Sequence, residues 1–377
     1  MNEKLYNLLV ILEDKLSADC QSEIFEVHRK SLNWEPVERL PLIILFPYPR
    51  LSSVQPFPHR EVFDNPEKML YNELVSAFDT SIFLHSEMGD DLPFTIRANF
   101  GTVIIASLFG GKVEQRDDNP PWLRHYETLD EFKTIFEKDP LDFSQGICRQ
   151  VIERYRFYND ILSDFSNLKK CIKVVLPDLQ GPLDSLELLR GSEIYTDFIL
   201  DSEMIENGLK LMAEAQVGFA KHLHSLITAG TEDYSFQHAV PIKGNILIRN
   251  DSAIMISSEM YSSQVAPHDE FVLKKMGGGG IHSCGKIDFN LNGIFKLPSI
   301  QCFDFGQSYL NDINSVYPLA RDKKIPLLRI RPQKEELLSG EIYKKFPTGI
   351  SLVYEASSFE EAKFVSKKYF GKKFISK

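Results

Sequence analysis

The sequence predicts an α/β protein, a closed (β/α)8 TIM barrel with an N-terminal helical extension and an inserted hairpin. Eight short, wholly apolar runs are bounded by prolines, glycines or other turn residues, a pattern typical of strands that are buried on both faces. Helical patterns lie between most of these runs, and a parallel crossover needs such a connecting element. Eight strand–helix units favour a closed barrel over an open sheet.

The elements follow one another along the whole chain. The predicted strands lie in residues 38–50, 78–87, 171–182, 244–253, 279–286, 298–306, 325–332 and 349–358. The clearest predicted helices lie in residues 65–78, 201–226, 258–276, 307–321 and 357–370. Apolar residues at spacings of three and four near the start predict a helical cap over residues 1–39, followed by a barrel domain over residues 40–377. Residues 93–116 alternate differently and contain two glycines, which predicts the inserted hairpin.

Composition narrows the classes of function. With 43% hydrophobic and 25% charged residues, the 377-residue chain is close to the average soluble globular protein, and no segment is apolar enough to span a bilayer. A net charge of -10 argues against sequence-independent binding of nucleic acid. Five scattered cysteines do not form the disulfide framework of a secreted domain. Acidic residues interrupt the N-terminal apolar run, which disfavours a secretory signal. We therefore expect a cytoplasmic protein that acts on a small molecule.

Ionisable and amide side chains gather where the predicted strands end. Barrel enzymes collect their working residues at the carboxyl ends of their strands, so these side chains are candidates for a site. In chain order they are Arg50, His85, Glu87, Asp178, Gln180, Asp251, His282, Cys284, Asp304, Arg329, Arg331 and Glu355.

The stretch "GGGGIHSCGKID", residues 277–288, has three interpretations. A phosphate-binding loop is disfavoured because Ile287 stands where a hydroxyl side chain should bind Mg²⁺ and no strand precedes the glycines. In a metal site, His282 and Cys284 would point to one face of a strand and offer ligands that Zn²⁺ prefers, with Glu355 or Asp304 as a third. In the third interpretation the glycines form a turn, and the two side chains only pack.

Two stretches, beginning "VVLPDLQGP" at residue 174 and "NDSAIMISSEMYSSQVAPHDEFVLKKMGGGGIHSCG" at residue 250, have a combined pattern that is more specific than any single motif. The Q-G-P turn, the D-S-A followed by S-x-E-M-Y, and the glycine-led I-H-S-C-G occur in an order that resembles the uroporphyrinogen decarboxylase superfamily. The resemblance covers roughly residues 40–370 and implies a (β/α)8 barrel. That superfamily also contains zinc methyltransferases that move a methyl group from a corrinoid protein to a thiol.

The two branches of this superfamily imply different chemistry. The decarboxylases have an R-Q-A-G-R-Y strand and an F-S-D-I-L strand, where this chain has "LFPYPRLSS" with Arg50 and "IFLHSEMG" with His85. The methyltransferases hold zinc with His-x-Cys on the fifth strand and a cysteine on the eighth. His282 and Cys284 match the first two ligands, and Glu355 stands near the third. The resemblance therefore implies Zn²⁺ on these three residues and methylcobalamin carried by a corrinoid partner protein.

The remaining candidates divide into two roles. We predict catalytic roles for Asp251, Arg50, His85, Glu259 and Tyr261, and substrate binding by Asp178, Gln180, Asp304 and Arg329. Simpler roles stay open, because Asp251 can cap a helix that begins at Ser252, and Glu259 and Tyr261 suit the start of a helix.

Three functions remain open, and the zinc-dependent methyltransferase leads them. The second is a metal-free decarboxylase that acts on a porphyrinogen or another polycarboxylate. The third is a non-catalytic binder of a corrinoid or tetrapyrrole.

Overall fold

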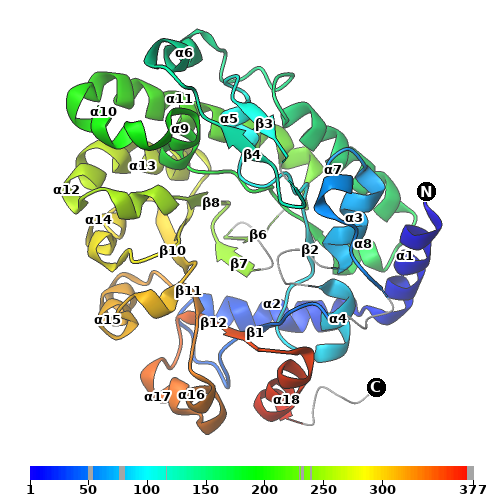
Figure 1. Cartoon of the computed structure of the whole chain (residues 1–377). Helices are drawn as coiled ribbons and strands as arrows, with labels where there is room; N and C mark the ends of the chain where they lie inside the picture. Colours follow the sequence, from blue (N-terminus) through cyan, green and yellow to red (C-terminus); the bar gives the residue numbers. More distant parts are fainter. Residues whose placement is uncertain are drawn as a thin grey trace.

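The core of the protein is a six-stranded parallel sheet in the order β1-β12-β11-β10-β9-β8. The computed structural model describes residues 1–49, 54–75, 81–115, 117–228, 230, 233–237 and 240–371. Helices surround the strands of this sheet (Figure 1). Its strands are β1 (Leu42–Leu45), β8 (Ile246–Arg249), β9 (Gly279–Ser283), β10 (Ile300–Phe305), β11 (Leu327–Ile330) and β12 (Ile350–Glu355). These six strands confirm six of the predicted runs and establish a mixed α/β fold.

Three two-stranded sheets accompany the central sheet. β2 (Thr95–Ile96) pairs in parallel with β5 (Lys173–Val174), whereas β3 (Lys112–Glu114) with β4 (Trp122–Arg124), and β6 (Tyr234–Gln237) with β7 (Val240–Lys243), are antiparallel. The predicted hairpin over residues 93–116 is therefore wrong in its position. That range begins with a parallel strand, and the hairpin extends to residue 124.

Eighteen α-helices occur in the described part of the chain, together with short 3₁₀ turns. They are α1 (Glu3–Lys15), α2 (Ala18–Leu32), α3 (Pro66–Val75), α4 (Ile82–Met88), α5 (Ile104–Ser107), α6 (Leu129–Lys133), α7 (Cys148–Ser163), α8 (Leu168–Cys171), α9 (Pro182–Arg190), α10 (Ile194–Leu200), α11 (Ser202–Leu223), α12 (Ser258–Met260), α13 (Ala266–Lys275), α14 (Leu291–Ile294), α15 (Ile313–Lys323), α16 (Lys334–Ser339), α17 (Glu341–Lys345) and α18 (Phe359–Phe370). Among the described residues, no helix has the length and apolarity needed to span a membrane.

Helix α4 replaces the second predicted strand. The Ser81 hydroxyl accepts a hydrogen bond from the Leu84 backbone N–H and caps the start of the helix. Gly89, at φ 72°, ends the helix in the left-handed conformation that favours glycine. The apolar run at residues 82–84 therefore belongs to a short buried helix.

The N-terminal helices α1 and α2 confirm the predicted helical start and pack against the sheet. The Ser31 hydroxyl on α2 donates to the carbonyl oxygen of Ile350 at 2.6 Å and accepts from its N–H at 3.2 Å. Ile350 is the first residue of β12, so α2 lies at the amino end of that strand. The Phe25 ring on α2 also contacts Tyr234 and Phe236 of β6. A domain boundary at residue 39 stays a prediction.

Candidate metal centre

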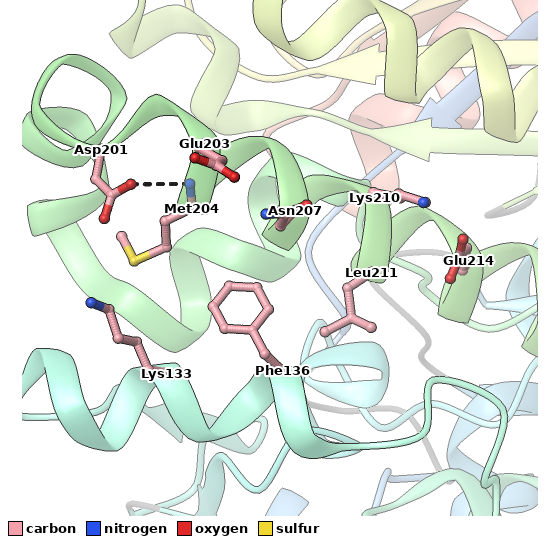
Figure 2. Close-up of a pocket in the computed structure, with 9 residues that line it drawn as sticks. All are labelled: Lys133, Phe136, Asp201, Glu203, Met204, Asn207, Lys210, Leu211 and Glu214. Carbon is pink, nitrogen blue, oxygen red and sulfur yellow. Dashed lines mark hydrogen bonds between the residues drawn. The ribbon is translucent and has the colours of Figure 1, made fainter.

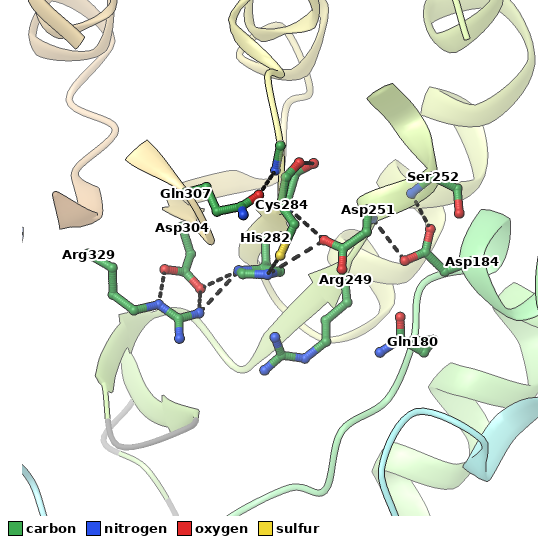
Figure 3. A network of polar contacts seen from close by, with 12 residues as sticks. Gln180, Asp184, Arg249, Asp251, Ser252, His282, Cys284, Asp304, Gln307 and Arg329 are labelled. Carbon is green, nitrogen blue, oxygen red and sulfur yellow. Dashed lines mark hydrogen bonds and ion pairs between the residues drawn. The ribbon is translucent and has the colours of Figure 1, made fainter. Parts of the chain in front are cut away.

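The register of three neighbouring strands brings the main polar side chains together. Arg249 on β8 pairs with His282 on β9, which pairs with Asp304 on β10. Residues in register on adjacent parallel strands point to the same face, so the three side chains share one face at the carboxyl ends of the strands. Figure 3 draws all three side chains and the contacts between His282 and Asp304.

His282 is the centre of a network of polar contacts and is nearly buried. Its Nδ1 lies 2.7 Å from Asp304 Oδ2, while Nε2 lies 3.5 Å from Cys284 Sγ and 3.6 Å from Asp251 Oδ1. Because the Asp304 carboxylate accepts a hydrogen bond from the Nδ1–H, Nε2 is the ring nitrogen that can present a lone pair. The imidazole therefore presents a ligand atom to the side where the thiol and the second carboxylate lie.

Arg329 holds Asp304 from the other side. Its Nε donates to Asp304 Oδ1 at 2.6 Å and its Nη2 to Oδ2, which makes a bidentate ion pair. Burial alone would raise the pKa of Asp304, but the charge of Arg329 and the hydrogen bonds from His282 and Arg329 outweigh it and hold the pKa well below its usual range. Arg329 has φ 55°, and the β11–β12 register shifts around it. This irregular backbone costs energy and aims the guanidinium at Asp304.

Asp251 is held by hydrogen bonds on both sides. Its Oδ1 accepts a 2.7 Å hydrogen bond from the Cys284 N–H, and its own N–H donates to the Asp184 carboxylate on α9. Asp184 also accepts from the Ser252 N–H at 2.9 Å. Burial, and then the charge of Asp251, raise the pKa of Asp184 to about 8. Asp251 thus points to Cys284 and His282, and the helix-capping role is filled by Asp184.

The donor set of Asp251, His282 and Cys284 fits a zinc ion. Their ligand atoms all lie within 4.8 Å of one another. Ligand bonds of about 2.0 Å for Zn–N and about 2.3 Å for Zn–S at the tetrahedral angle would separate nitrogen and sulfur by about 3.5 Å, close to the observed spacing. Burial, followed by the charge of Asp251, raises the pKa of the Cys284 thiol to about 12. A metal is what would make this thiol a ligand at neutral pH.

Glu355, the predicted third ligand, lies outside this trio. Its carboxylate accepts a 2.7 Å hydrogen bond from Arg331 Nε, and its side chain is 55% exposed. Asp251 takes the expected place because the loop after β8 passes beside the end of β9. The structure thus offers Asp251 in place of Glu355.

Asp178 and Gln180 lie beside the trio and bind protein groups. Gln180 Nε2 donates to Asp178 Oδ1 at 3.2 Å, and Asp178 also pairs with Arg249 and with Arg97 Nη1, the latter at 3.6 Å. All four side chains are nearly buried. All four substrate-binding candidates, these two and the Asp304–Arg329 pair, therefore lie around the trio of Asp251, His282 and Cys284.

Four other predicted catalytic residues are placed elsewhere or are not described. His85 lies on α4, where its Nδ1 is 2.8 Å from Asp90 Oδ1. Glu259 is exposed, and the buried Tyr261 hydroxyl donates to Asp269 at 2.8 Å. Arg50 lies outside the described residues. His85, Glu259 and Tyr261 make no hydrogen bond or ion pair with the trio among the contacts of the described chain.

Arg249 and Asp184 are site residues that the sequence did not single out. Arg249 is the one charged residue in the otherwise apolar run "ILIR" of β8. A charged residue in a buried strand is the sequence feature from which its role could have been predicted. Asp184 sits in the first turn of α9, where an acidic residue is usual in any helix. No sequence feature distinguishes its role.

A separate pocket of about 610 Å³ lies between α11 and the segment after α6 (Figure 2). Both acidic and basic side chains line it, and one of them, Asp201, caps α11 through the Met204 N–H. Its lining residues are Lys133, Phe136, Asp201, Glu203, Met204, Asn207, Lys210, Leu211 and Glu214. None of these belongs to the polar network of Figure 3.

Comparison of the chain with protein-family models and with curated proteins found no match in either.

Proposed function

We propose that this protein is a zinc-dependent enzyme in which Asp251, His282 and Cys284 hold the metal. The observation that supports this most is the two-sided bonding of His282, whose Nδ1 meets Asp304 while Nε2 faces a thiol and a carboxylate. A carboxylate behind a metal-binding histidine fixes the ring and increases the basicity of the ligand atom. Three protein ligands also leave a fourth position for a substrate, as in catalytic zinc sites.

The proposed fold is a closed (β/α)8 barrel. Both edges of the six-stranded sheet are hydrogen-bonded to the segments that contain β5 and β2. At one edge the Gly181 N–H donates to the Arg249 carbonyl at 2.7 Å, and at the other the Asp91 N–H donates to the Leu42 carbonyl at 2.9 Å. Since β2 pairs with β5, these bonds support a ring of eight parallel segments. Catalysis at the carboxyl end of the strands is the usual arrangement in such barrels.

The proposed reaction is the transfer of a methyl group from a corrinoid partner protein to a thiol. It rests on the resemblance to the uroporphyrinogen decarboxylase superfamily and on a donor set that contains both imidazole and thiolate. When bound, zinc lowers the pKa of a thiol so that it is a nucleophile at neutral pH. His282, Asp251 and Cys284 would hold the metal, and the Asp304–Arg329 pair holds His282 in place. By its use of cysteine, the protein would act in the cytoplasm.

Metal analysis of protein purified without chelators tests the proposal. We expect about one zinc per chain, lost in Asp251→Asn, His282→Ala and Cys284→Ala and kept in Glu355→Gln. Two exposed residues supply matched controls, His59→Ala and Cys20→Ser, which should keep the metal.

Three results would contradict the proposal of a zinc-dependent enzyme. Folded wild-type protein that neither contains nor binds zinc would end it. CO₂ release from uroporphyrinogen by that metal-free protein would favour the decarboxylase. Binding of a corrinoid without turnover would favour the non-catalytic binder.

A further inference from the structure

One buried cation of the site has an unused donor. Arg249 is 5% exposed, and its Nη2 is shielded from water with no hydrogen-bond acceptor in the described part of the chain. Its Nε forms an ion pair with Asp178 Oδ1 but, like Nη2, has no hydrogen-bond acceptor in suitable geometry among the described residues. A buried N–H group without an acceptor costs free energy, and native structures almost always satisfy such groups with protein, water or a ligand.

The Asp178 carboxylate behind Arg249 is shared among several donors. Asp178 accepts from Gln180 and pairs with both Arg97 and Arg249, so one carboxylate serves several donors. A guanidinium has five N–H donors in a planar fork, which suits an oxyanion with two oxygens. The Nη2 of Arg249 keeps part of that capacity.

The unused donor of Arg249 lies close to the proposed metal ligands. Arg249 is the register partner of His282 and points to the same face, one strand away. In Figure 3 its guanidinium lies below Asp251 and His282, between Arg329 and Gln180. Asp251 is 45% exposed, so solvent reaches the site from that side.

We propose that Arg249 binds an oxyanion group of the substrate, a carboxylate or a phosphate, one strand away from the metal ligand His282. This deepens the proposed function and rests on it for the adjacent metal, whereas anion binding itself needs no metal. The substrate is then an anionic small molecule whose charged group is fixed by Arg249 while another part of it reaches the fourth metal position.

The test is a titration of full-length protein with butyrate, with its neutral isostere butyramide, and with inorganic phosphate. Binding is followed by ligand-observed NMR at constant ionic strength, in chelator-treated and in zinc-loaded protein. We expect saturable binding of butyrate or phosphate but not of butyramide, and the anion that binds more tightly identifies the group. Arg249→Gln should weaken it at least about tenfold, because hydrogen bonds to charged groups contribute roughly 1.5–3 kcal/mol.

Two further variants complete the design. Arg249→Lys keeps a charge beside Asp178 but loses the fork, so it should fold and still bind the anion several-fold more weakly. Arg149→Gln, at an exposed position of α7, is the matched control and should bind as the wild type does. Absence of anion binding to the folded wild type, or equal binding by the Arg249 variants, would overturn the proposal.

The two proposals fail separately. Zinc binding without anion binding would refute the role of Arg249 alone. Anion binding that depends on Arg249 in a protein that never takes up zinc would refute only the metal centre.

Discussion

Replacement of Asp304 by asparagine is the most informative single change for the metal centre. The carboxylate is almost completely buried, and it accepts two hydrogen bonds from Arg329 and one from His282 Nδ1. Asparagine has one acceptor oxygen, and its NH₂ group would face donors. The variant therefore leaves Arg329, whose side chain is 18% exposed, without its counter-charge.

The expected loss of stability is large. Removing one partner of a buried ion pair costs about 3–5 kcal/mol, and the partial exposure of Arg329 favours the lower value, about 3 kcal/mol. Since a domain is typically stable by about 5–15 kcal/mol, the variant should still fold. Loss of the carboxylate behind a metal-binding histidine should also weaken zinc binding about 10–100-fold.

Urea unfolding of the metal-free protein and zinc competition with a chelator measure the two effects. Asp312→Asn, at the exposed cap of α15, is the control and should cost less than about 1 kcal/mol, because asparagine also caps helices well. The low folded-state pKa of Asp304 means that its ionised form stabilises the protein above the unfolded pKa near 4, and this contribution is lost as the pH falls. The difference between wild type and Asp304→Asn should therefore shrink below about pH 4. A loss under about 1 kcal/mol with unchanged zinc affinity would refute the role given to Asp304.

Two further predictions concern residues next to the site. Burial raises the pKa of Asp269 to about 7. Between about pH 4 and pH 7 the folded protein therefore binds more protons than the unfolded chain, so the free energy of unfolding falls as the pH rises. Asp269→Asn should remove this pH dependence, which amounts to at most roughly 4 kcal/mol of unfolding free energy. If urea unfolding of the variant shows the same dependence of stability on pH as the wild type, the prediction is wrong. In Gly280→Ala, the new Cβ would lie 2.5 Å from Cys302 Sγ and 3.1 Å from the Cys302 carbonyl, which should cost about 1–3 kcal/mol. Adding Cys302→Ala should recover part of that loss in the melting temperature, and no recovery would argue against this clash.

The central strands could be predicted because their sequences leave few alternatives. The runs in β8 and β10 are short and apolar, bounded by turn residues, and buried in the structure as that pattern predicts. The run at residues 82–84 has the same composition, and only the cap at Ser81 and the glycine at 89 distinguish it as a helix. Strand β2 has two residues, too few for any periodicity to mark.

The site residues that lie on one strand could be predicted from the sequence, whereas those that lie on separate loops could not. His282 and Cys284 belong to one extended stretch, so their common face follows from the period of two. The choice between Asp251 and Glu355 depends on where two different loops pass in space. The Asp251 position is set by hydrogen bonds from Cys284 and to Asp184, which are contacts across more than 30 residues of sequence. Only the three-dimensional structure resolves that choice.

The most direct test of zinc binding by Asp251, His282 and Cys284 is a crystal structure of zinc-loaded protein with anomalous data at the zinc absorption edge. We expect one strong peak bonded to His282 Nε2, Cys284 Sγ and an Asp251 carboxylate oxygen, with Asp304 still hydrogen-bonded to His282 Nδ1. A peak bound by Glu355 in place of Asp251, or no peak among these residues in crystals soaked with zinc, would contradict it.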